Sequence, residues 1–337
     1  MNILVTGNNG YIGPVLYDEI KKKKFKSKIF GLDTNYFKVK NFSDIQLNFD
    51  IREFPKKVFE NKFQSVIHLA SLSNDPIGNR YEKQTEQINI KATKRLIDLA
   101  KKNGCKSFIF ASSCSVYGKN GNNSRHEGCK TQPLTAYAKS KIIIENYLKK
   151  KSDKNFKAIC LRFATACGAS PNIRLDLVLN DFVFSAITKK RIELNSSGNA
   201  WRPLIDVKDM CEAIIYSVQN THKVKKILII NVGSNLCNYK IIDLAKKVKS
   251  IFKNTSIKTQ NKIHDKRSYK VDFSKYNKFK NNEYKHLSIE KSILKLKKNI
   301  EILYKKSKKI NFNKFVRLKV LEQKINSKKL TQNLRWR

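Results

Sequence analysis

The sequence lacks the features that mark secreted, membrane-spanning and metal-binding proteins. It opens as MNILVTG, without the basic segment and small-residue cleavage site of a signal peptide. No apolar run reaches the roughly 18 residues that a membrane-spanning helix requires. The seven cysteines form no C-x-x-C pair, and the five histidines form no cluster at the spacing of metal ligands. We therefore expect a soluble, cytoplasmic protein with reduced thiols, no metal and no membrane span.

Acidic residues are also scarce, because 27 Asp and Glu stand against 70 Lys and Arg and give a net charge of +43. Only 12 of the basic residues are arginines, although a phosphate-reading surface favours the arginine fork. The excess is densest in residues 280–337, with 18 Lys and Arg against 4 Glu. We interpret most of it as solvated surface and expect no specific nucleic-acid partner. Attraction of an anionic substrate, of nucleic acid or of a membrane surface stays open as the alternative.

Short apolar runs alternate with amphipathic stretches over the first 165 residues. Runs of this length, apolar on both faces, are typical of parallel strands covered by helices on both sides. The predicted strands are residues 2–7, 28–33, 65–70, 107–112 and 158–163, and the predicted helices include residues 79–102 and 137–150. This alternation predicts an α/β fold with a doubly wound parallel sheet.

The pattern is looser after residue 165. We expect helices at 175–188, 207–219 and 239–252, a strand at 226–233 and a loop at 195–205. A further helix is expected after Ser288, which is a suitable N-cap. With 337 residues, the chain is long enough for two lobes.

A glycine-rich turn follows the first predicted strand. Residues 6–13 read TGNNGYIG, with glycines at 7, 10 and 13, and open a predicted helix. Such glycines let the backbone turn tightly and approach a pyrophosphate, which then lies at the helix N-terminus. Asp33 ends the second predicted strand, where a carboxylate accepts hydrogen bonds from an adenosine ribose and repels a 2′-phosphate. The two features predict a bound dinucleotide and favour NAD over NADP.

The G-x-x-G-x-x-G spacing resembles that of the short-chain dehydrogenase/reductase superfamily. The segment FASSCSVYG at 110–118, followed by Tyr137 and Lys141, is similar to the extended members that act on nucleotide sugars, the epimerase/dehydratase family. The likeness spans most of the chain and includes Asp50-Ile51, His68-Leu69-Ala70, Asn89, Arg162, Asn180, Trp201-Arg202-Pro203, Asp209 and Arg267. It implies a Rossmann fold with a smaller C-terminal lobe, NAD as cofactor and a nucleoside-diphosphate sugar as substrate.

The resemblance implies that Ser113, Tyr137 and Lys141 are catalytic. A phenol with the usual pKa of about 10 is a poor base at neutral pH, but a lysine ammonium one helical turn away stabilises the phenolate. Tyr137 could then take the proton of a sugar hydroxyl while NAD takes the hydride, and Ser113 would hold the oxygen. The same Tyr-x-x-x-Lys spacing occurs six times in the chain, and only this copy follows a predicted strand that carries the serine.

Dehydratases of this family carry an Asp and a Glu immediately after the catalytic serine or threonine. This chain has Cys114 and Ser115 there, which argues against 4,6-dehydration. We therefore expect an epimerase that works through a transient 4-keto sugar. The alternatives are a nucleotide-sugar 4-dehydrogenase or ketoreductase, and a non-catalytic NAD-sensing regulator, although regulators of this kind typically lose the tyrosine or the lysine.

Most of the site residues that the resemblance implies lie in the first half of the chain. The expected cofactor-binding residues are Gly7, Gly10, Tyr11, Ile12, Gly13, Asp33, Asp50, Ile51, Leu69, Ala70, Asn89, Tyr137 and Lys141. The expected substrate-binding residues are Ser73, Asn74, Asn180, Arg202 and Arg267. At two positions the chain departs from many relatives, because Asp206 stands where they have histidine and Cys167 where they have tyrosine.

The same resemblance suggests how the chain is divided. We expect an NAD-binding domain in residues 1–165, to which residues 206–233 return, and mainly a substrate-binding lobe and C-terminal tail in residues 166–337. It also implies a homodimer formed through the helices at 79–102 and 137–150. Residues 310–337 extend past the usual end of the family. Our hypothesis is that Trp336 anchors this tail on the protein or on a neighbouring subunit near the site, and the alternative is disorder.

Overall fold

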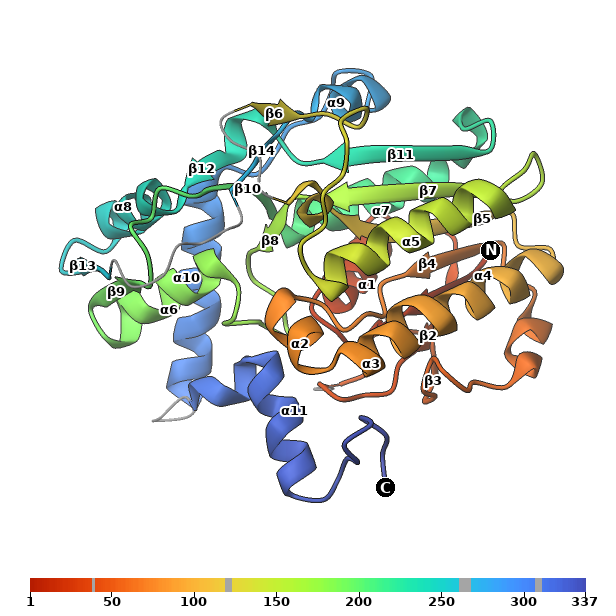
Figure 1. Cartoon of the computed structure of the whole chain (residues 1–337), viewed down its shortest axis with the longest axis horizontal. Coiled ribbons are helices and arrows are strands. Elements are labelled where there is room, and N and C mark those ends of the chain that lie inside the picture. The colour runs from red at the N-terminus through yellow and green to blue at the C-terminus, as the bar shows by residue number, and fades with distance from the viewer. Residues whose placement is uncertain (38–39, 119–122, 261–267, 307–310) are drawn as a thin grey trace.

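A seven-stranded parallel sheet forms the centre of the larger lobe (Figure 1). The structure, a computed structural model, describes residues 1–37, 40–118, 123–260, 268–306 and 311–337. The strand order is β11-β7-β5-β4-β1-β2-β3. The bounds are β1 Asn2–Thr6, β2 Lys28–Leu32, β3 Ile45–Leu47, β4 Ser65–His68, β5 Ser107–Ser113, β7 Lys157–Phe163 and β11 Ile227–Val232. The predicted doubly wound sheet is confirmed, and its strand order reverses direction between β1 and β4, where such folds bind ligands.

Helices cover both faces of this sheet (Figure 1). One face packs against α1 (Gly13–Lys22) and α7 (Val207–Gln219), through a core that contains Ile3, Leu16 and Ile214. The other face packs against α4 (Thr93–Lys102) and α5 (Ala136–Lys151). Burial on both sides explains why the strands read as almost continuous apolar runs.

The stretch predicted as one helix at 79–102 is divided into four pieces. It comprises the end of α2 (Asp75–Arg80), then α3 (Glu82–Thr85), a π-helical segment over Glu86–Ala92 and α4. Tyr81 separates α2 from α3 because its backbone angles, φ −127° and ψ 58°, are not helical. The prediction of helical structure is therefore right for most of the stretch and wrong about its continuity.

The smaller lobe has its own core, formed by α6 (Val178–Thr188), α8 (Ile241–Ile251) and α10 (Ile289–Lys306). Ser288 accepts a hydrogen bond from the backbone of Lys291, as expected of the N-cap of α10. The loop predicted at 195–205 is wrong in its last part, where β10 (Trp201–Asp206) lies between β8 and β12. The remaining strands are β6 Ser124–Arg125, β8 Thr165–Cys167, β9 Arg191–Leu194, β12 Asn238–Lys240, β13 Ser256–Thr259 and β14 Lys270–Val271, and α9 is Ser274–Phe279.

The C-terminal segment returns from the smaller lobe to the larger one (Figure 1). A 3₁₀ turn at Phe312–Phe315 leads into α11 (Arg317–Asn326). Leu321, Leu330 and Leu334 are at most 1% exposed and belong to the core beneath α4 and α5. The hypothesis that the tail is anchored on the protein is confirmed, and the anchor is the chain's own sheet lobe.

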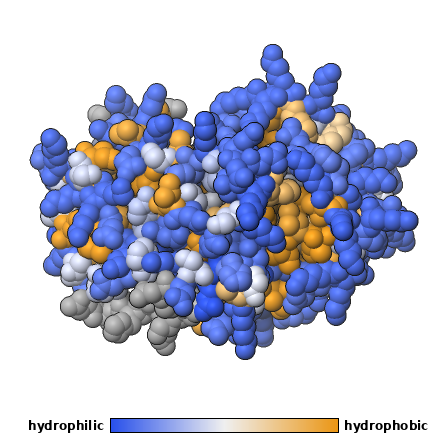
Figure 2. Space-filling model, turned by 90° about the horizontal axis from the view of Figure 1, so that it is seen from above, coloured by the Kyte–Doolittle hydropathy of each residue, from blue (hydrophilic) through white to orange (hydrophobic). Residues whose placement is uncertain are grey.

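Hydrophilic residues cover much of the face seen in Figure 2, around smaller apolar areas. Many lysines lie at helix ends, including Lys101 and Lys102 in the last turn of α4 and three lysines in the last turn of α5. Within the residues described, no helix combines the length and apolar character needed to cross a bilayer. The described part of the chain therefore fits the interpretation of the lysines as solvated surface.

Candidate active site

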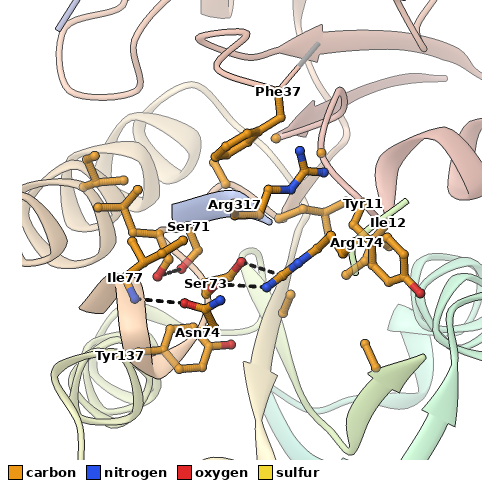
Figure 3. A pocket seen from close by; sticks show the side chains of 18 of the residues that line it. Tyr11, Ile12, Phe37, Ser71, Ser73, Asn74, Ile77, Tyr137, Arg174 and Arg317 are labelled. Atoms are coloured by element: carbon orange, nitrogen blue, oxygen red, sulfur yellow. Dashed lines mark hydrogen bonds between the residues drawn. The ribbon is translucent and has the colours of Figure 1, made fainter. Parts of the chain in front are cut away.

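A cavity of about 280 Å³ opens at the carboxyl ends of β1, β4 and β5. This is the edge of the sheet where the strand order reverses, so turns from both halves of the fold meet there. The cavity is lined by the turns after these strands, by the start of α5 and by residues of the smaller lobe (Figure 3). The fold therefore brings the separately predicted motifs to one place.

The glycine turn forms one wall of the cavity with its backbone. Gly7 has φ +74°, and a Cβ there would lie 2.6 Å from the backbone nitrogen of Ala70. Gly13 lets α1 pack closely against the turn, since a Cβ at this position would lie only 2.1 Å from the carbonyl oxygen of Asn8. Ile12, the N-cap residue of α1, lines the cavity, and its side chain makes no capping hydrogen bond to the helix. Such a surface fits a pyrophosphate.

Asp33 lies at the end of β2 on the same cavity wall. Its carboxylate accepts hydrogen bonds from the backbone N–H groups of Asn9, at 3.0 Å, and Asn35, at 2.7 Å. These bonds fix its orientation in the cavity wall next to the glycine turn. Asp50 also lines the cavity, but it forms an ion pair with Arg52 at 2.6 Å. The arrangement fits the adenosine ribose of a dinucleotide at Asp33.

Ser113, Tyr137 and Lys141 all line this cavity. Ser113 ends β5, and Tyr137 is the second residue of α5, whose N-cap Thr135 accepts a hydrogen bond from the backbone of Ala138 at 3.2 Å. The side chain of Ser113 lies close enough to the phenol of Tyr137 to lower the pKa of that phenol. Lys141, one turn further along α5, donates to the carbonyl oxygen of Ala111 at 2.9 Å. The three predicted catalytic side chains therefore meet at the carboxyl end of β5.

Burial shifts the pKa values of Tyr137 and Lys141 in opposite directions. It raises the pKa of Tyr137 to about 12, against a smaller lowering by the Ser113 hydrogen bond. It lowers the pKa of Lys141 to about 7, against a smaller raising by Glu145. Desolvation disfavours the charged form of either group, which explains both directions. The phenolate expected from the Tyr-x-x-x-Lys spacing is therefore not favoured by the protein alone.

The other copies of this spacing show why it is a weak signal by itself. The lysine nitrogen lies 5.1 Å from the tyrosine ring centre in the Tyr137 pair, 5.2 Å in the Tyr17 pair and 5.1 Å in the Tyr147 pair. Tyr17 and Tyr147 instead donate hydrogen bonds to surface carboxylates. Among the pairs whose two residues the structure describes, only the Tyr137 pair lines the cavity, where it lies with Ser113, and this context separates it from the others.

The sequence of this site matches a known family. The description "NAD dependent epimerase/dehydratase family" covers residues 3–233, which include the glycine turn, Asp33 and the Ser113, Tyr137 and Lys141 group. The chain belongs to this family. The predicted resemblance is thereby confirmed, and NAD is the cofactor of the family.

Individual members are similar to the chain at low identity. UDP-glucose 4-epimerase 2 of Oryza sativa subsp. japonica is 26% identical over 188 residues, covering 50% of this chain and 46% of that protein. The chain thus matches about half the length of that relative. UDP-glucose 4-epimerase of Haemophilus influenzae is 28% identical over 302 residues, covering 80% of this chain and 87% of that protein. Among solved structures, MoeE5 in complex with UDP-glucuronic acid and NAD has a TM-score of 0.79 at 19% identity, covering 90% of this chain and all of that one, and so shares the fold.

In this epimerase/dehydratase-family chain, Arg174 of the smaller lobe points toward Ser73 in the loop after β4 (Figure 3). Arg174 contacts Asp176 at 2.9 Å and donates to the hydroxyl of Ser73 at 3.0 Å. Asp176 accepts a hydrogen bond from the side chain of Asn74 at 2.8 Å. The backbone of Asn74 has a φ of 122°, which is a strained value for a residue other than glycine. Its side-chain oxygen caps α2 by accepting a hydrogen bond from the backbone N–H of Ile77. Arg174, which lines the cavity, was not among the predicted site residues.

Most predicted site residues line the cavity, but four other predicted residues lie behind it or elsewhere. Gly13 packs under the glycine turn, and Asn89 holds the backbone of Leu72 through two hydrogen bonds. Asn180 is fully buried and binds the backbone of Gly168 and Arg174. Arg202 lines a separate hollow with Tyr269.

The fifth, Arg267, lies outside the described residues. Many other cavity residues, among them Phe37 and Arg317, were not predicted. No signal in the sequence marks Arg317 except that it lies in the basic C-terminal stretch. No group of three or more His, Cys, Asp or Glu side chains that could hold a metal occurs in the described ranges.

Proposed function

We propose that the chain is an NAD-dependent enzyme that epimerises a nucleoside-diphosphate sugar through a transient 4-keto sugar. The observation that carries this proposal is that Ser113, Tyr137 and Lys141 line the same cavity as the glycine turn and Asp33. A hydroxyl-bearing carbon near Tyr137 would then lie next to a dinucleotide held by the turn. UDP-sugars are the substrate class that the names of its relatives suggest.

Bound NAD would supply the hydride acceptor, and inversion of the carbon requires that the hydride return to the opposite face of the 4-keto sugar. Tyr137 would accept the proton of the sugar hydroxyl through its phenolic oxygen and give it back when the carbonyl is reduced. Ser113 would hold the hydroxyl oxygen by a hydrogen bond, since its side chain lines the same cavity as the phenol. The cycle leaves no net oxidation, because proton and hydride both return to the sugar.

Burial opposes the charged form of both Tyr137 and Lys141, so the proposed base needs further positive charge near the phenol. In this structure the pKa of Tyr137 is about 12 and that of Lys141 about 7, so both side chains lose charge to burial. A neutral phenol cannot take a proton until its pKa falls. Positive charge brought close to the phenol, on Lys141 or on a ligand, lowers the pKa of the phenol.

The proposed binding residues follow from their places on the cavity wall. Gly7, Gly10, Tyr11 and Ile12 would face the pyrophosphate, and Asp33 the adenosine ribose. Asp50, Ile51, Leu69 and Ala70 would complete the cofactor side, with Gly13 and Asn89 supporting it from behind. Ser73 and Asn74 would face the sugar, positioned by Arg174 and Asp176.

The division of labour between the lobes is also a proposal. Residues 1–165 would bind the cofactor. Residues 206–233 would belong to the same domain, because their strand β11 pairs with β7 in the main sheet. The smaller lobe would bind the nucleotide diphosphate through Asn180, Arg202 and Arg267. A homodimer through α4 and α5 would leave the cavity accessible, since it opens at the carboxyl ends of the strands.

The test is to incubate the protein with a panel of nucleotide sugars, following NADH absorbance and product NMR, with Tyr137→Phe as control. A new sugar isomer without net NADH supports the epimerase. Steady accumulation or consumption of NADH identifies a 4-dehydrogenase or ketoreductase instead. Binding of NADH without turnover of any nucleotide sugar would point to the regulator, and undiminished turnover by Tyr137→Phe would refute the mechanism.

A further inference from the structure

The C-terminal segment beyond residue 310 contributes directly to the wall of the cavity. Arg317, the first residue of α11, is only 5% exposed and lines the cavity with Gly10, Tyr11 and Asp33. This residue lies outside the range 3–233 that matches the family. The part of the chain that defines the family therefore does not include this cation.

Arg317 is held in place by uncharged groups. Its guanidinium carbon lies 4.1 Å from the ring centre of Phe37, and one nitrogen donates to the carbonyl oxygen of Asn172 at 3.2 Å. In the described ranges, Arg174 pairs with Asp176, whereas no carboxylate lies within ion-pair distance of Arg317. Burial and the charge of Arg174 lower the pKa of Arg317 to about 9, against Asp176 and Asp33, which raise it. A buried cation without a paired anion is costly, so an anionic ligand in this cavity would relieve it.

The position of Arg317 in the cavity indicates which anionic group it would bind. Figure 3 shows its side chain beside Phe37, with Tyr11 and Arg174 nearby. The glycine turn, which fits a pyrophosphate, and Asp33, which fits the adjoining ribose, share this wall of the cavity. A guanidinium can donate two parallel hydrogen bonds to phosphate oxygens. A dinucleotide could place its phosphates at the glycine turn and Arg317 and its ribose at Asp33.

The residues after α11 fasten the adenosine end of the same cavity. Arg52, paired with Asp50, donates to the carbonyl oxygens of Asn333 at 2.8 Å and Leu334 at 2.7 Å. The hydroxyl of Tyr36 also donates to Leu334. Trp336 donates to the carbonyl oxygen of Thr34 at 2.6 Å, and its ring centre lies 5.9 Å from that of Tyr36. Thr34, Tyr36 and Asp50 are cavity residues, so the C-terminus braces the wall between them.

We propose that the C-terminal segment, residues 317–337, is part of the cofactor site: Arg317 binds the pyrophosphate of NAD, and docking of residues 330–336 slows release of the dinucleotide. The proposal rests on the NAD site described above and adds a residue and a segment to it. The cofactor would be retained through both hydride transfers, as an epimerase requires. Undocking of the segment would be the step that frees it.

The first test measures binding of NADH by fluorescence, and of adenosine, AMP, ADP, ADP-ribose and UDP by displacement, to wild type and Arg317→Ala. Loss of charge-assisted hydrogen bonds should weaken NADH, ADP and ADP-ribose by about 10- to 100-fold and leave adenosine nearly unchanged. Arg317→Lys, which keeps the charge but not the fork, should lie between. Lys319→Ala removes an exposed cation from the same helix and should match wild type.

Each other outcome overturns the assignment. Equal losses for adenosine and ADP would make Arg317 a structural residue, and a loss for UDP alone would assign it to the sugar nucleotide. Unchanged NADH binding in Arg317→Ala would reject the proposal while leaving the proposed enzyme intact. Failure of the wild type itself to bind NADH would instead reject the proposed function.

The second test measures the dissociation rate of NADH in stopped flow for a deletion of residues 331–337 and for Trp336→Ala. Loss of one hydrogen bond and one aromatic contact should raise the rate by about 10-fold in Trp336→Ala, and the deletion should raise it further. Trp336→Ala keeps Leu334 and its buried contacts, so it tests release in a folded protein. A dissociation rate equal to that of wild type in Trp336→Ala would overturn the role of the docked segment.

Discussion

At the scale of single residues, the proposed chemistry depends on a phenol and an amine that share one buried end of α5. Lys141 lies 5.1 Å from the ring centre of Tyr137 and 4.9 Å from that of Phe110. The sequence could predict this pair, because helical spacing places residues 137 and 141 on one face. It could not predict the pKa values, because these depend on the strands that bury the pair.

We expect Tyr137→Phe to lower kcat about 10²- to 10⁴-fold, because the phenylalanine ring fills the same space and has no group to accept a proton. The measurement is steady-state turnover of the substrate found in the panel, together with NADH binding, which should stay close to wild type. Tyr147→Phe is the matched control, since Tyr147 has the same spacing to Lys151 and bonds to Asp98 at the surface. Equal losses of kcat in the two variants would contradict the assignment.

Lys141 should reduce stability at neutral and acidic pH. Its pKa is lowered from 10.5 to about 7, so the folded state holds the proton less tightly than the unfolded state. Below about pH 7 the buried Lys141 therefore lowers the free energy of unfolding by its full amount. This destabilisation decreases as pH rises from about 7 to 10.5.

The variant Lys141→Met, which cannot titrate, should accordingly melt at a higher temperature than wild type at pH 6, by about several degrees, and lose most of this advantage by pH 10. Thermal unfolding at the two pH values checks this expectation. Activity should be lost in the variant at both. A difference in melting temperature that is the same at pH 6 and pH 10 would show that titration of Lys141 is not responsible.

At the scale of elements, the glycine turn and α1 act as one unit. Gly13→Ala would place a methyl group 2.1 Å from the carbonyl oxygen of Asn8, which cannot move without shifting the turn. We expect this variant to weaken NADH binding at least about 10-fold, since the shifted turn would no longer fit the pyrophosphate. The measurement is an NADH titration.

Gly104→Ala is the control for backbone strain. Gly104 has φ +76° and lies in the turn after α4, where a Cβ would meet no atom of the described residues within 4 Å. This variant should lose about 1–2 kcal/mol of stability from the left-handed backbone and bind NADH normally. Tight NADH binding by a folded Gly13→Ala would contradict the role of the turn.

Elements with strong local patterns were predictable, and elements made by distant pairing were not. The strands of the main sheet were found because they are buried on both faces, and α7 matches the predicted 207–219 at both ends. β10 was missed because WRPLID contains a proline and two charged residues, and it forms a strand by pairing with β8 and β12. β3 is only three residues long and shows no pattern of its own.

At the scale of the whole molecule, the C-terminal segment is the feature that sequence patterns could least predict. Its partners, Tyr36 and Arg52, lie 298 and 282 residues away from Leu334 along the chain. Local signals show only a basic stretch with scattered leucines. The glycine turn and the Tyr137 region, in contrast, depend on motifs of a few residues, so these parts of the cavity could be named from the sequence while Arg317 could not.

The two lobes are joined by carboxylates at the start of α7, and this junction should be sensitive to pH. Asp209 accepts a hydrogen bond from the backbone of Leu287 at 2.8 Å, and Asp206 accepts one from Ser292 on α10 at 2.7 Å. Burial raises the pKa of Asp209 from 3.8 to about 7, with further raising by Asp206 and Glu212 and lowering by the Leu287 bond and Lys208. The folded protein therefore binds this proton more tightly than the unfolded chain.

The sign of the effect follows from this difference. The stabilising contribution of Asp209 is fully present below about pH 4 and is lost as pH rises through about 7. Asp209→Asn keeps an acceptor for Leu287 and removes the titration. We expect the melting temperature of wild type to fall relative to that of Asp209→Asn between pH 4 and pH 8, so that the variant is the more stable protein at pH 8. Thermal unfolding across this range, with the exposed Asp243→Asn as control, tests it, and parallel curves for wild type and Asp209→Asn would contradict the role of Asp209 at the lobe junction.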